Sequence, residues 1–98
     1  MPWPNQIWNG FDKGTVNGRA PNVSGVYALR GSGGQWLYVG ESARVASSLL
    51  GHLAGDNARL AESRPTTFSF EPCDAGQRTA RRGALIAELL PPCNMRPG

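Results

Sequence analysis

The sequence offers little material for a metal centre or a disulfide framework. It contains one histidine, His52, and two cysteines, Cys73 and Cys93, which do not form a CxxC motif. This pattern is typical neither of a zinc site nor of a small domain held together by disulfides. We therefore expect two ordinary thiols in a reducing cytosol, and the sequence leaves a disulfide between them open.

Long apolar runs are also absent. No window reaches the apolar length that a membrane-spanning helix requires. The N-terminal stretch MPWPNQIWNGF is neither basic nor continuously apolar, which argues against a signal peptide. A chain of 98 residues fits one small domain. Together these features predict a cytoplasmic single-domain protein.

Negative charge is scarcer than positive charge. The chain has 7 acidic and 10 basic residues, a formal net charge of +3, and Lys13 is its only lysine. Arginine suits bidentate contact with phosphate groups. The excess is mild, however, and a solvated arginine surface explains it equally well, so composition alone leaves nucleic-acid binding open.

The most informative stretch is residues 24–40, SGVYALRGSGGQWLYVG. Residues 26–29 and 36–39 are short apolar runs joined by glycines, which is typical of a β-hairpin. A four-residue turn would place Arg30 opposite Gln35. Tyr27 and Tyr38 would then face each other directly, with both hydroxyls on one face of the sheet.

A helix is predicted over residues 43–53, with Ser42 as its N-cap. Its apolar residues fall on one face, and Arg44, Ser48 and His52 form a neighbouring polar stripe at i, i+4 and i+8. The following residues, 57–63, are compatible with another short helix.

A third strand is predicted over residues 66–71, because Phe68 and Phe70 alternate with polar residues and would point to one buried face. A last helix is predicted from about residue 75 to residue 90, with Asp74 as its N-cap and a proline pair at its end. Its first half carries three arginines, Arg78, Arg81 and Arg82.

Residues 1–23 are predicted to form an irregular N-terminal arm with a short helical turn within residues 11–17, followed by a domain over residues 24–98. We expect the apolar residues of the arm to pack on the domain. The alternative is that an exposed tryptophan stacks on nucleic-acid bases. These residues are Trp3, Ile7, Trp8 and Phe11.

The triplets 25–27, Gly-Val-Tyr, and 38–40, Tyr-Val-Gly, resemble the paired signature of the GIY-YIG nuclease family. The similarity continues to His52 at the end of the first helix and to Pro91, Pro92 and Asn94 after the last one. It covers roughly residues 24–94. The fold that it implies is a small α/β domain in which a three-stranded, mainly antiparallel sheet is flanked by helices.

The resemblance also implies a function, hydrolysis of phosphodiester bonds in DNA. By position, Tyr27 would act on the water nucleophile with Tyr38 as its neighbour, and His52 and Asn94 would belong to the same site. In the family, a glutamate on the last helix holds one divalent cation, so Mg²⁺ or Mn²⁺ is the implied cofactor.

Two positions depart from the family pattern. Ser48 stands where an arginine is usual, and Arg82 stands where the glutamate is usual. A guanidinium cannot ligate a metal. It would repel a divalent cation about 4 Å away by roughly 8 kcal/mol at an effective dielectric of 20. Arg44 could partly replace the missing arginine, and Glu41 or Glu71 could act as relocated metal ligands.

The sequence therefore predicts an endonuclease-like domain with a degenerate site, and leaves its activity open. One alternative is a non-catalytic nucleic-acid-binding module, and another is a protein-interaction or inhibitory module. The residues that would bind nucleic acid are Arg44, Arg78, Arg81 and Arg82. Each also has a plain structural explanation, as a solvated arginine, and Asn94 could simply cap backbone groups.

Overall fold

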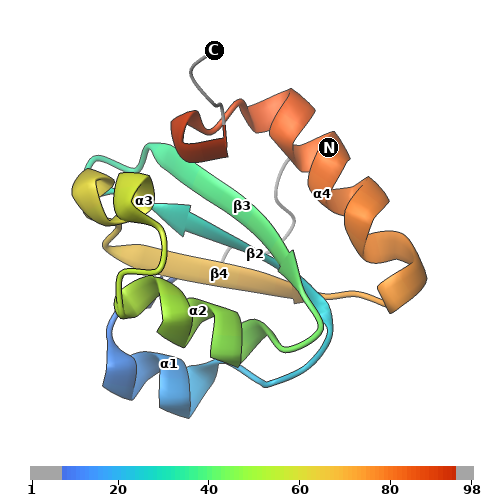
Figure 1. Ribbon diagram of the computed structural model, residues 1–98, viewed down its shortest axis with the longest axis horizontal. Helices are drawn as coiled ribbons and strands as arrows, with labels where there is room; N and C mark the ends of the chain where they lie inside the picture. Colours follow the sequence, from blue (N-terminus) through green and yellow to red (C-terminus); the bar gives the residue numbers. More distant parts are fainter. Residues whose placement is uncertain (1–7, 95–98) are drawn as a thin grey trace.

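The computed structural model describes residues 8–94, which form one antiparallel sheet with helices on both faces (Figure 1). The predicted packing of Trp3 and Ile7 lies outside these residues. The elements follow one another in the order β1 (Asn9–Gly10), α1 (Lys13–Arg19), β2 (Gly25–Arg30), β3 (Trp36–Ser42), α2 (Val45–Leu53), α3 (Ala58–Ser63), β4 (Thr67–Pro72), α4 (Ala75–Leu89) and the 3₁₀ turn η1 (Pro92–Asn94).

The sheet has four strands, in the order β1-β4-β2-β3, so the prediction of three strands is wrong. The additional strand is β1, whose Asn9 and Gly10 pair with Phe68 and Thr67 of β4. A strand of two residues has no alternating pattern from which it could be recognised. The division of the chain at residue 24 stays a prediction.

The hairpin of β2 and β3 has a different register from the predicted one. Tyr27 lies opposite Gly40, and Tyr38 lies opposite Leu29, so the two tyrosines do not face each other directly. They still share a face of the sheet, because a shift of two residues along a strand preserves the direction of the side chains.

The difference in register comes from the turn. Arg30 pairs with Trp36 rather than with Gln35, and the backbone N–H of Gly31 donates to the carbonyl of Gln35. The turn therefore contains five residues, and the pairing shifts again between Leu29 and Arg30. A β-bulge of this kind adds one residue to one strand and cannot be read from the glycine count.

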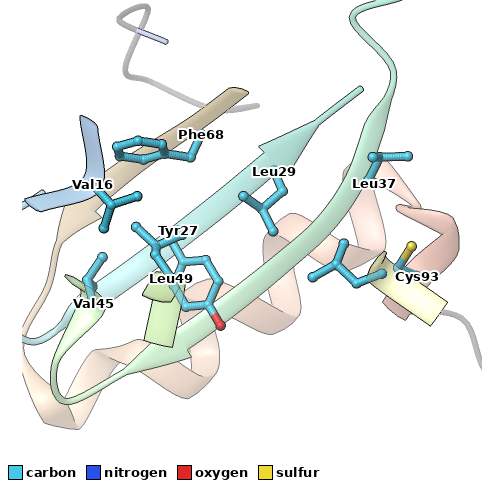
Figure 2. Close-up of a cluster of buried hydrophobic side chains, with 9 residues drawn as sticks. Val16, Tyr27, Leu29, Leu37, Val45, Leu49, Phe68 and Cys93 are labelled. Atoms are coloured by element: carbon cyan, nitrogen blue, oxygen red, sulfur yellow. The ribbon is translucent and has the colours of Figure 1, made fainter. Parts of the chain in front are cut away.

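Helices cover both faces of the sheet. One face packs against α1, α2 and α3 through Val16, Val45, Leu49 and Leu60 (Figures 1 and 2). The other face packs against α4 through Leu85. Ser69 of β4 is consequently buried, so the prediction that this strand has one buried face is wrong.

Trp8, in the predicted arm, packs on the α4 side of the sheet. The guanidinium of Arg30 lies 4.6 Å from the centroid of the Trp8 ring and 5.5 Å from that of Trp36. The two indole rings meet edge to face at 5.2 Å. These contacts favour the packing interpretation of Trp8 over base stacking, since a cation already covers the ring.

The two cysteines are free thiols, and Cys93 is buried, with its Sγ atom 3.2 Å from the hydroxyl of Ser63. Over residues 8–94, none of the helices has the length and apolar character needed to cross a membrane.

Candidate functional site

Tyr27, Tyr38 and His52 come together on the face of the sheet that α2 covers. The Tyr27 ring centroid lies 6.2 Å from that of Tyr38 and 5.6 Å from that of His52, and the Tyr38 and His52 centroids are 5.3 Å apart. The hydroxyl oxygen of Tyr27 is 2.7 Å from Nε2 of His52, which is hydrogen-bond distance. Three elements, β2, β3 and α2, thus contribute one ring each to a single cluster.

The ring of Tyr27 lies over Gly40. A Cβ atom at position 40 would come within 2.4 Å of both Cζ and the hydroxyl oxygen of Tyr27, closer than such atoms can approach. Figure 2 shows the Tyr27 ring with its hydroxyl at the end far from Phe68. The glycine of the second triplet therefore makes the room in which the tyrosine of the first triplet lies.

The surroundings of Tyr27 keep its hydroxyl protonated. Burial raises the pKa of Tyr27 far above its usual value, and electrostatic interactions with Tyr38 and Asp56 raise it further. The positive charge of Arg82 lowers it. A base role for Tyr27 at neutral pH therefore needs a partner that accepts its proton, and His52 lies at the required distance.

His52 has a second partner that sequence reasoning missed. Its Nδ1 atom lies 2.8 Å from a carboxylate oxygen of Asp56. The His52 side chain is only 9% exposed, whereas that of Asp56 is 54% exposed. The spacing of four residues is the signal that could have revealed the pair, although Asp56 lies beyond the helix end.

Arg44 is not part of the ring cluster. It is exposed and occupies the N-cap position of α2, so the prediction of Ser42 as the N-cap is wrong by two residues. The hydroxyl of Ser42 instead accepts the backbone N–H of Arg44 at 2.9 Å and the Ser48 hydroxyl at 2.7 Å. Ser48 is thus held in a hydroxyl pair at the start of α2.

Asn94 binds the backbone of β3. The N–H of Val39 donates to Oδ1 of Asn94 at 2.7 Å, and Nδ2 of Asn94 donates to the Val39 carbonyl at 2.9 Å. Since β3 is an edge strand, this side chain satisfies backbone groups that would otherwise lack a strand partner. Its observed contacts are those of a structural cap.

Two of the three arginines on α4 are paired with carboxylates on the sheet. Nε of Arg81 lies 3.1 Å from Glu71, and Nε of Arg78 lies 3.7 Å from Glu41. The hydroxyl of Thr79 also donates to Glu41 at 3.1 Å. These contacts fasten α4 to β3 and β4, and they occupy both carboxylates that the sequence offered as relocated metal ligands.

The described residues of the candidate site do not fit a divalent cation. Among residues 8–94, no three His, Cys, Asp or Glu side chains come together as metal ligands would. Arg82, at the position that the resemblance assigns to a glutamate, has no carboxylate partner within this part of the chain, and its positive charge acts on Tyr27. This donor set favours an anion over a cation near Tyr27.

Comparison with solved structures identifies the class of fold. The GIY-YIG N-terminal endonuclease domain of UvrC from Thermotoga maritima, bound to magnesium as its catalytic divalent cation, has a TM-score of 0.69 at 20% identity, covering 82% of this chain and 96% of that chain. Two point mutants of that domain, each bound to its divalent cation, have TM-scores of 0.69 and 0.68 at 19% and 20% identity, with coverage of 83% and 96%. No protein-family model and no curated protein matches the chain.

This likeness shows an α/β endonuclease fold. More particularly, it is the fold of a GIY-YIG endonuclease domain, which confirms the resemblance that the two triplets predicted. At about one fifth identity, the likeness carries the fold and not the chemistry of the site.

Proposed function

We propose that this domain binds DNA through the face formed by Tyr27, Tyr38 and His52, and that metal-dependent cleavage is weak or lost. The observation that carries the proposal is the ring cluster itself. Residues from β2, β3 and α2 meet at the positions that the resemblance assigns to a phosphodiester site. Arg82, whose positive charge acts on Tyr27, supplies a charge that a phosphate can bind.

The four candidate arginines differ in how free they are to contact phosphate. Arg44 and Arg82 have no ion-pair partner among residues 8–94, whereas Arg78 and Arg81 each face a glutamate. A guanidinium that is already neutralised contributes less to binding a polyanion. We therefore assign the main phosphate contacts to Arg44 and Arg82, and to Arg78 and Arg81 chiefly the anchoring of α4.

The proposed loss of cleavage follows from the donor set. The family reaction relies on a divalent cation to offset charge at the leaving oxygen. In this chain, Arg82 replaces the expected ligand, and Glu41 and Glu71 are held by arginines. A guanidinium can bind a phosphate, but it cannot hold a metal ion. We therefore expect the domain to bind DNA without efficient metal-dependent hydrolysis.

The test is a titration of labelled duplex DNA at several salt concentrations. Contact with two to four phosphates predicts a log–log slope of about −2 to −4. Arg82→Ala and Arg44→Ala should each weaken binding and reduce the slope by about 1. Arg59→Ala, which removes an exposed arginine of α3, is the matched control and should change little. Absence of binding even at low salt would refute the proposal.

A protein-interaction role is the second candidate, because the surface has a mainly apolar hollow. It has a volume of about 570 Å³. Exposed Leu53 contributes to it. If wild-type protein fails to bind DNA, this function becomes the better one. The hollow lies between α1 and α2 and is lined by Phe11, Asp12, Lys13, Leu50, Leu53 and Ala54.

A further inference from the structure

The chain turns back on itself directly after α2. Gly55 has a φ of +91°, in the left-handed region that favours glycine. The N–H of Asp56 then donates to the carbonyl of Gly51 at 3.2 Å. This turn brings the carboxylate of Asp56 back to the last turn of the helix, where Oδ1 lies 2.8 Å from Nδ1 of His52.

Position 51 leaves room for this carboxylate. A Cβ atom there would lie 2.8 Å from Oδ2 of Asp56, so a larger residue would push the carboxylate away from the imidazole. Gly51 and Gly55 therefore both serve the approach of Asp56 to His52. Glycine at position 51 costs helix propensity, and the atoms that a Cβ there would meet belong to Asp56 and not to the core.

The chemistry of the two hydrogen bonds fixes their direction. An ionised carboxylate only accepts, so Nδ1 of His52 carries a proton and donates it to Asp56. In the neutral imidazole, Nε2 is then an acceptor, and the hydroxyl of Tyr27, 2.7 Å away, must donate to it. The single proton of Tyr27 is thereby committed to His52, and the phenol oxygen retains only lone pairs.

We propose that Asp56 is a positioning residue that holds His52 in the Nδ1–H tautomer, so that Tyr27 presents its oxygen to the binding face as an acceptor. This inference deepens the proposed function and rests on it, because it assumes that a ligand binds at this face. It also specifies chemistry, because the group that meets Tyr27 must donate a hydrogen bond. A water molecule or the free hydroxyl at the end of a DNA strand can do so, whereas a phosphate oxygen cannot and is left to Arg82.

The tautomer can be measured without any catalytic activity. His52 is the only histidine of the chain, so the imidazole signals of untagged, ¹⁵N-labelled protein need no assignment. A long-range ¹H–¹⁵N correlation spectrum, recorded across a pH series so that the neutral ring is compared, shows which nitrogen carries the proton. The expected result is a protonated Nδ1 and an unprotonated Nε2, with a hydrogen-bonded Tyr27 hydroxyl.

Asp56→Ala should release this preference and move the proton toward Nε2. Its side chain is 54% exposed, so the substitution leaves the core intact, which a circular dichroism spectrum checks. Asp74→Ala is the matched control, because it removes an exposed carboxylate that makes no side-chain cap hydrogen bond. Tyr27→Phe should keep the tautomer, since Asp56 and not Tyr27 sets it.

The outcomes separate this inference from the proposed function. A wild-type His52 with its proton on Nε2, an unchanged tautomer in Asp56→Ala, or a reversal in Tyr27→Phe would each overturn the positioning role, whatever the DNA titration shows. Conversely, the expected tautomer together with absence of DNA binding would overturn the proposed function and leave the role of Asp56 toward His52 standing.

Discussion

Replacing Gly40 with alanine tests whether Tyr27 is held as the structure describes. The new Cβ atom would lie 2.4 Å from the end of the Tyr27 ring, and this ring cannot easily retreat because it is buried among Val45 and Leu49. Overpacking of this kind costs about 1–3 kcal/mol. Displacing the ring also breaks its hydrogen bond to His52, which contributes about 1 kcal/mol. The gain from a stiffer unfolded chain, about 0.4–1 kcal/mol, offsets only part of this loss.

We therefore expect Gly40→Ala to lower the free energy of unfolding by about 1–3 kcal/mol, measured by urea denaturation. The matched control is Gly83→Ala, in α4, where an added Cβ atom meets nothing within 4 Å. The same chemical change there should stabilise the protein by up to about 1 kcal/mol, because alanine is the better helix former. The His52 signal should move in the first variant and stay in the second. Equal or greater stability of Gly40→Ala would refute the contact between Tyr27 and position 40.

Three further predictions concern the metal position, the strand edge and the pH dependence. Wild-type protein should show little Mg²⁺- or Mn²⁺-dependent plasmid nicking, and robust cleavage by the wild type would refute this prediction. The double variant with Arg82→Glu and Ser48→Arg should bind metal more tightly and show weak nicking, which adding Tyr27→Phe should abolish. Asn94→Ala should cost about 1–3 kcal/mol in thermal unfolding, because two hydrogen bonds to Val39 are lost; an unchanged melting temperature would contradict it. Stability should fall as the pH rises above about 10, since burial raises the pKa of folded Tyr27 and the unfolded chain loses that proton first; an equally steep fall in Tyr27→Phe would exclude this explanation.

Much of the architecture could be predicted from periodicity and turn residues. The hairpin, the helix that ends near His52, the strand with Phe68 and the last helix are all present close to their predicted bounds. These elements have strong local signals, namely alternation in strands and a one-sided apolar face in helices. Strand β1 has no such signal, because two residues are too few to show alternation. Its pairing is also non-local, since its partner β4 lies nearly sixty residues away.

The arrangement of the site was less predictable. The common face of Tyr27 and Tyr38 follows from the period of two in a strand, and it is observed. Their register depends on a bulge, a backbone feature without a distinct residue type. Asp56 was overlooked because its approach to His52 depends on a left-handed residue just beyond the helix, which periodicity does not describe.

The positions that match the resemblance and those that depart from it have different physical roles. Gly40 makes room for a buried ring, and Asn94 closes the edge of β3, so replacing either would disturb packing or backbone hydrogen bonding. Ser48 and Arg82 lie at the periphery of the core, and neither belongs to its buried residues. A change from glutamate to arginine at position 82 alters the charge presented to a ligand without opening a cavity or leaving a buried group unpaired. The two triplets therefore describe how Tyr27 is packed more directly than they indicate catalysis, because a fold does not by itself determine the chemistry of its site.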